Sequence, residues 1–205
     1  MRRLAMLGVA VASTTLLSAP TRGEEPAWEV SAAALAYFVP GEDAFVSPVL
    51  RADRGGLHLE ARYNYEDRGT ASAWLGWNLS VGESVTFDAT PMLGGVFGDT
   101  SGIAPGFEVS LAWGRLELYS EGEYLFESSG PEESFFYSWS EATFSPLEGL
   151  RLGLMGQRTR AYETDLDLQR GLLVGYSGER LDFTAYLLNT GWDDPTLVLS
   201  LGVSF

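Results

Sequence analysis

Carboxylates dominate the side chains that could do chemistry. The stretch Glu117-Leu118-Tyr119-Ser120-Glu121-Gly122-Glu123 places three of them and one tyrosine at alternate positions. In an extended strand, alternate side chains share one face at a spacing of about 7 Å. Three such carboxylates repel one another unless Arg62, Arg151 or a cation lies opposite. The pattern therefore indicates either an internal ion-pair network or an acidic surface that attracts cations.

Catalytic and metal-binding arrangements are poorly represented. The chain has one His and no Cys, which excludes a multi-histidine metal site, thiolate chemistry and disulfides. His58 is the only histidine base, and its alternation with Leu57 and Leu59 places it on a polar face. A glycosidase could work with two carboxylates alone, but the spacing singles out no such pair. We therefore predict no enzyme activity and no cofactor.

The overall charge is strongly negative. Thirteen basic residues, all Arg, stand against 28 acidic ones in 205 residues, which gives a formal charge of −15. Nucleic-acid binding needs clustered basic residues to neutralise phosphates, so nucleic acid is not an expected partner. Hydrophobic residues make up 45% of the chain, enough for one folded domain.

The carboxylates must be positioned by strands, because period-2 alternation recurs from Trp28 onward. Turn residues separate the alternating segments, and the connections alternate between very short turns and longer acidic loops. We expect twelve strands, or ten if Pro48 prevents the second one and its partner from forming. Their approximate ranges are 28–39, 45–53, 56–66, 69–80, 84–97, 102–114, 116–128, 134–146, 149–161, 168–177, 181–190 and 195–205.

The first residues are typical of an export signal. Arg2 and Arg3 precede an apolar run from Leu4 to Leu17, followed by small and turn residues. The run is short for a membrane-spanning helix, which needs roughly 20 apolar residues. We expect residues 1–23 to be a cleaved signal peptide and residues 24–205 to form one domain.

Three features indicate that the apolar face points outward, to lipid. Charge is concentrated on the polar face, and aromatic residues gather near the expected strand ends, as at bilayer interfaces. Trp28, Trp77, Trp113 and Phe205 fall toward the short turns, while Tyr63, Tyr65, Phe97, Phe126 and Phe136 fall toward the longer loops. The third feature is the last strand, which alternates from Leu197 and ends on Phe205.

This last strand resembles the C-terminal signature of Gram-negative outer-membrane β-barrel proteins. The resemblance implies an all-β, transmembrane, antiparallel up-and-down barrel in the outer membrane. It also implies that Phe205 serves as a membrane-assembly signal for the barrel assembly machinery, and that outer-membrane lipid and lipopolysaccharide surround the barrel. By size and layout, the chain resembles small twelve-stranded porin-like channels for oligosaccharides. Channels for acidic sugars line their pores with Arg or Lys, whereas the polar face here is acidic.

If the apolar face meets lipid, the polar face lines the lumen. We expect these side chains to line a pore: Glu60, Arg62, Asp88, Glu108, Glu117, Tyr119, Glu121, Glu123, Glu141 and Arg151. Rings of acidic side chains select for cations, so a narrow, cation-preferring passive diffusion channel for small solutes is the leading interpretation. The alternative is a structural or interaction barrel whose lumen is plugged by ion pairs and whose acidic loops contact a partner.

Overall fold

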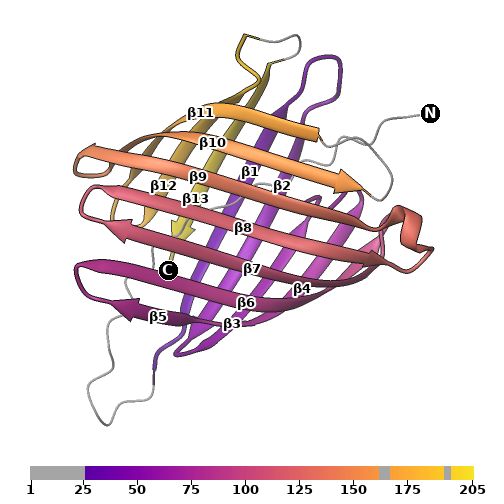
Figure 1. The fold of residues 1–205 in the computed structure, drawn as a ribbon, viewed down its shortest axis with the longest axis horizontal. Coiled ribbons are helices and arrows are strands. Elements are labelled where there is room, and N and C mark those ends of the chain that lie inside the picture. Colours follow the sequence, from indigo (N-terminus) through magenta and orange to yellow (C-terminus); the bar gives the residue numbers. More distant parts are fainter. Residues whose placement is uncertain (1–25, 162–166, 192–194) are drawn as a thin grey trace.

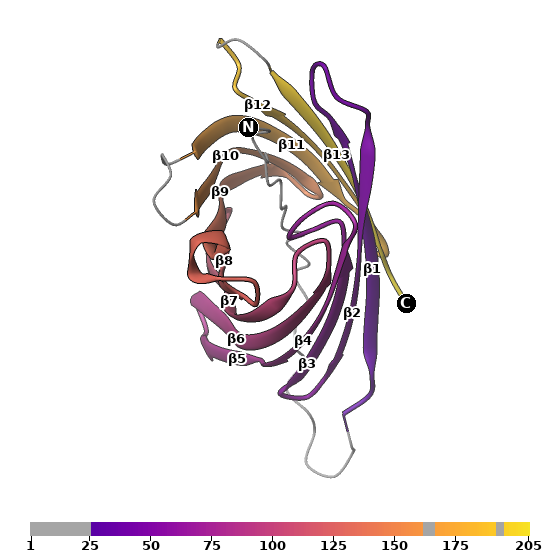
Figure 2. The ribbon, with the colours of Figure 1, turned by 90° about the vertical axis from the view of Figure 1, so that its right-hand side faces the viewer.

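The chain forms a closed antiparallel barrel of twelve strands with one additional short strand. The computed structural model describes residues 26–161, 167–191 and 195–205. The expected signal peptide over residues 1–23 lies outside them, as do residues 162–166 and 192–194, which fall between expected strands. Strands follow one another around the barrel in chain order, and β1 pairs with β13. Figure 1 shows the barrel from the side, and Figure 2, turned by 90°, shows the ring that the strands form.

The alternating segments of the sequence form the strands. Their bounds are β1 (Glu29–Phe38), β2 (Phe45–Arg54), β3 (Leu57–Tyr63), β4 (Thr70–Trp77), β5 (Leu79–Gly82), β6 (Val85–Gly98), β7 (Gly102–Trp113), β8 (Leu116–Glu127), β9 (Phe135–Leu147), β10 (Leu150–Ala161), β11 (Asp167–Ser177), β12 (Leu181–Leu188) and β13 (Thr196–Ser204). The expectation of twelve strands is confirmed. Pro48 is accommodated within β2, opposite Ala34.

The additional strand arises from a break in one expected strand. The predicted segment 69–80 divides at Asn78 into β4 and β5. Its register against β6 continues through the break, from Gly76 opposite Met92 to Leu79 opposite Ala89. The break itself lies beside Pro91, which this register places opposite Trp77 and which has no N–H to donate to the strand ladder. The register nevertheless stays the same on both sides of the break. β4 and β5 therefore act as one wall segment of the barrel.

The connections differ between the two ends of the barrel. At the turn end, short connections such as Gly114-Arg115 join the strands, with Gly114 at φ 61°, which favours glycine. At the loop end, the β8–β9 connection includes the 3₁₀ turn η1 (Pro131–Glu133), seen at the right of Figure 1. Among the described residues, no helix is long and apolar enough to cross a membrane.

Apolar side chains cover the outside, and the alternation decides which residues they are. On β8, Leu116 and Leu118 are about half exposed, whereas Tyr119, Glu121 and Glu123 are buried inside. Trp77 and Trp113 at the turn end, and Phe97 and Phe126 at the loop end, are also exposed. These positions suit an apolar band with aromatic residues at both interfaces.

Tyr65 departs from this pattern, and its prediction as an interfacial aromatic is wrong. Its side chain is only 3% exposed. The expected strand 56–66 ends earlier, at Tyr63, because Asn64 takes the left-handed conformation at φ 53°. The chain therefore turns after Tyr63 and directs Tyr65 and Glu66 into the barrel, where both are buried.

Candidate functional site

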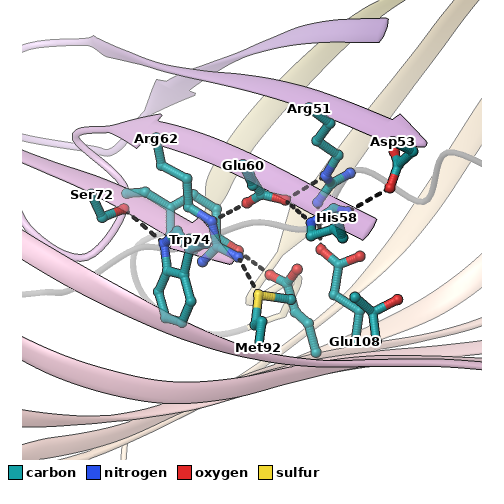
Figure 3. A network of polar contacts seen from close by, with 12 residues as sticks. Arg51, Asp53, His58, Glu60, Arg62, Ser72, Trp74, Met92 and Glu108 are labelled. Atoms are coloured by element: carbon teal, nitrogen blue, oxygen red, sulfur yellow. Dashed lines mark hydrogen bonds and ion pairs between the residues drawn. The ribbon is translucent and has the colours of Figure 1, made fainter. Parts of the chain in front are cut away.

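The middle of the barrel interior holds a network of ion pairs centred on Glu60 (Figure 3). Glu60 on β3 accepts hydrogen bonds from Arg51 of β2 and from Arg62, two residues further along its own strand. Arg51 Nη2 also donates to Glu108 Oε1 of β7 at 2.6 Å. Arg62 Nη1 donates to Glu123 Oε2 of β8 at 3.0 Å. The network thus links β2 and β3 to β7 and β8 across the barrel.

Arg62 is held by aromatic rings as well as by carboxylates. Its guanidinium carbon lies 4.3 Å from the ring centre of Tyr65 and 4.5 Å from that of Trp74, within cation–π distance. The space bounded by Arg62, Trp74 and Glu123 has no room for a water molecule. Charges that are removed from water in this way are stable only when they are paired.

The β3–β4 connection adds two further groups to the network. The Tyr65 hydroxyl donates to Glu121, and Ser72 Oγ donates to Glu66 Oε1 at 2.5 Å. Burial raises the pKa of the Glu66 carboxyl, and the nearby Arg62 partly opposes this effect. Oε2 of Glu66 and Oε1 of Glu123 are buried without a hydrogen-bond partner in the described part of the chain.

Toward the turn end, the inward side chains are polar and more accessible. His58 Nδ1 lies 2.8 Å from Asp53 Oδ1, and Arg151 Nη2 donates to Asp182 Oδ2 at 2.8 Å. The side chains of Glu108 and Asp182 are 15% and 23% exposed. Asp88 and Glu117 also point inward and are partly exposed. This end of the interior therefore presents acidic groups that water can reach.

Toward the loop end, the interior is closely packed and mainly apolar. Its buried side chains include Leu35, Tyr37, Val96, Leu125, Phe135, Leu188 and Val198. Trp139 packs edge-on against Tyr186, and both donate hydrogen bonds to Glu141 Oε1. The interior is therefore divided into a polar turn end, a charged middle and an apolar loop end.

All ten residues expected to line the lumen point to the inside of the barrel. The middle network brings together Glu60, Arg62, Glu108, Glu121 and Glu123, with Tyr119 donating to Glu121 Oε2 at 3.0 Å. Arg151 pairs with Asp182 rather than with Glu117. Glu141 belongs to the aromatic group described above. Asp88 lies apart from the network and accepts a hydrogen bond from Ser110 at 3.3 Å.

Sequence reasoning missed Arg51, Tyr65 and Glu66 as members of the network. Arg51 lies at an alternate position from Val49 in the expected second strand, so its inward direction could have been predicted. Tyr65 and Glu66 carry no such signal, because the turn at Asn64 ends the alternation before them. No cluster of three or more His, Asp or Glu side chains in the described ranges is arranged to hold a metal ion.

No family model matches the sequence, and no curated protein matches it. Solved structures nevertheless share its fold. The KdgM porin gives a TM-score of 0.61 at 11% identity, over 85% of this chain and 99% of that one. The KdgM porin in complex with disordered oligogalacturonate gives 0.62 at 9% identity with the same coverage. OpdL of Pseudomonas aeruginosa gives 0.47 at 11% identity, over 82% of this chain and 62% of that one.

Proposed function

We propose that this porin-like outer-membrane barrel is a narrow passive diffusion channel that prefers cations. The fold supports a channel, because the similar solved structures are porins. The sign of the inward charge supports the preference. Glu108, Glu117 and Asp182 face the accessible turn end, and rings of acidic side chains favour cations over anions. This excess of inward carboxylates is the observation that carries the proposal.

The dimensions support a narrow path for small solutes. Twelve strands give a barrel between the eight-stranded ones, which side chains fill, and the sixteen-stranded ones, which leave an open channel. Arg62, Trp74 and the surrounding carboxylates occupy the middle of the interior. We therefore expect a small conductance.

The charge also bears on the class of solute. One of the similar structures was determined with oligogalacturonate, a polyanion. An interior in which carboxylates outnumber arginines repels a polyanion, so we do not propose acidic sugars for this chain. The proposal includes no catalytic step, since the similar solved structures are porins.

The packed loop end favours a second candidate function. Leu125, Phe135 and Leu188 are fully or almost fully buried there, as in a protein core. A barrel filled in this way could be non-conducting and act through its loops, as a structural or interaction protein of the outer membrane.

Single-channel recording of the refolded protein under a KCl gradient tests the proposal. We expect small openings with a cation-selective reversal potential. The double variant Glu108→Gln/Glu117→Gln should lower the cation-to-anion permeability ratio at least about twofold, because it removes accessible inward charge. Glu132→Gln, in the exposed turn η1, is the matched control and should leave the ratio unchanged. Anion selectivity would overturn the cation preference, and silence from a folded barrel would favour the second candidate.

A further inference from the structure

Two arginines interrupt the apolar outer wall of the barrel. Arg158 on β10 and Arg170 on β11 alternate with inward residues and are exposed on the outside, near the loop end. Among the described outward side chains of the strands, the other charged one is Arg54, at the turn end of β2. A charge facing lipid is costly at the bilayer centre and far less so at the interface. The two arginines therefore mark the interface at the loop end.

The strand register places the two arginines side by side. Arg158 pairs with Leu168, and Arg170 pairs with Gly156. The arginines are thus diagonal neighbours on one face of an antiparallel pair, with backbones about 7–8 Å apart. Guanidinium groups at this spacing can contact one phosphate together, and Arg is suited to bidentate phosphate recognition.

An apolar groove begins beside Arg170 on the same outer wall. Its volume is about 430 Å³, within the range of ligand-binding pockets. Phe87, Leu111, Leu118 and Leu154 are among its walls, and the small residues Ser120, Ser140 and Gly156 line it between them. The register runs from Ser120 to Ser140, Gly156 and then Arg170. The groove therefore leads directly to the arginine pair.

We infer that this wall binds one molecule of lipid A, the phosphorylated, acylated glucosamine lipid of lipopolysaccharide. Arg158 and Arg170 contact a phosphate at the interface, and an acyl chain lies in the groove. Charge complementarity selects an anionic headgroup, and the apolar groove adjoining the arginines selects an amphiphile over a free anion. The site lies on the outer surface, so it does not depend on conduction through the lumen.

The test measures lipid binding to the refolded full chain by native mass spectrometry from detergent. We expect bisphosphorylated lipid A to bind in preference to phosphatidylethanolamine and phosphatidylglycerol. Arg158→Gln/Arg170→Gln should weaken lipid A binding at least about tenfold, because it removes both charge-assisted contacts. Arg54→Gln, an outward arginine at the opposite end, is the matched control and should bind as the wild type does.

A second variant tests the groove separately. A Cβ at Gly156 would meet only Gln169 O, at 3.9 Å, so the backbone accepts a side chain there and Gly156→Leu extends one into the groove. It should weaken lipid A binding severalfold while both arginines remain. Equal binding by the wild type and the double arginine variant would overturn the inference, as would equal loss in Arg54→Gln or a preference for phosphatidylglycerol. Heat-modifiable gel mobility confirms that each variant is folded, and unchanged ion selectivity separates this site from the lumen.

Discussion

Arg62 connects several elements of the barrel interior. Its guanidinium contacts carboxylates from β3 and β8 and the rings of Tyr65 and Trp74. Because the space beside Arg62 has no room for a water molecule, water cannot replace its guanidinium as the hydrogen-bond donor to Glu123. The residue therefore holds the charged middle of the barrel together.

Replacing Arg62 by Met should destabilise the barrel. Methionine retains much of the side-chain volume but leaves Glu123 without its arginine partner and Glu60 with Arg51 alone, and breaking a buried ion pair costs about 3–5 kcal/mol. The measurement is the free energy of unfolding by guanidinium in lipid vesicles, with tryptophan fluorescence as the readout. Arg115→Met is the control, since Arg115 is exposed at a turn and donates only to Pro146 O among the contacts described here. A loss below about 1 kcal/mol would show that the carboxylates find other partners.

The residues that share one face of a strand could be predicted from the sequence, but the ion-pair partners of their side chains could not. Alternation in the sequence places Glu60, Glu121 and Glu123 on the polar face of their strands, and in the structure all three are buried inside the barrel. Which arginine meets which carboxylate depends on the stagger between strands far apart in the chain, such as β3 and β8. A single sequence contains no local signal for that stagger, so the pairing of Arg151 with Asp182 could not be foreseen.

At the scale of elements, the β3–β4 connection enters the barrel. Tyr65 is hydrogen-bonded to Glu121, and Glu66 to Ser72. The sequence predicted a longer strand here, because Tyr63 and Tyr65 continue the alternation by type. The conformation of Asn64 ends the strand instead, and turn formation by a single Asn is a weak signal in sequence.

Glu66→Gln should reduce the pH dependence of stability. Burial raises the pKa of Glu66 in the folded protein. The contribution of Glu66 to the free energy of unfolding is therefore fully present below its pKa in the unfolded chain, about 4.3. This contribution is lost as the pH rises through the pKa of Glu66 in the folded protein. The free energy of unfolding should thus fall more steeply with rising pH in the wild type than in Glu66→Gln. Unfolding in vesicles between roughly pH 4 and 8 measures this.

Glu132→Gln provides the comparison for this prediction, because Glu132 is exposed in η1. Its stability curve should run parallel to that of the wild type. If the stability curve of Glu66→Gln also ran parallel to that of the wild type, Glu66 would be in contact with water in the folded protein. The β3–β4 connection would then be open to water.

At the scale of the whole molecule, the outer wall is mainly apolar, and most ionisable side chains of the described strands face inward. Alternation alone leaves that direction open, and aromatic positions near the strand ends gave the sequence-based argument for it. Leu75, in the middle of the continuous β4–β5 run, and Leu116, at the turn end of β8, are both about half exposed on the outside.

Leu75→Arg should cost about 2–4 kcal/mol of stability in vesicles, and Leu116→Arg about 0–1 kcal/mol, because the cost of a lipid-facing charge depends on its depth. Guanidinium unfolding of the two variants measures the difference. Equal costs would mean that Leu75 does not lie at the bilayer centre.

The pairing of β1 with β13 is the step that closes the barrel during folding. Residues 31–38 of β1 pair with residues 197–204, across almost the whole described chain. Such distant contacts form slowly. Until the last strand arrives, one edge of β1 and one edge of the growing sheet remain unpaired and available to other chains. The time before closure is therefore the period of greatest aggregation risk, and the completed ring ends it.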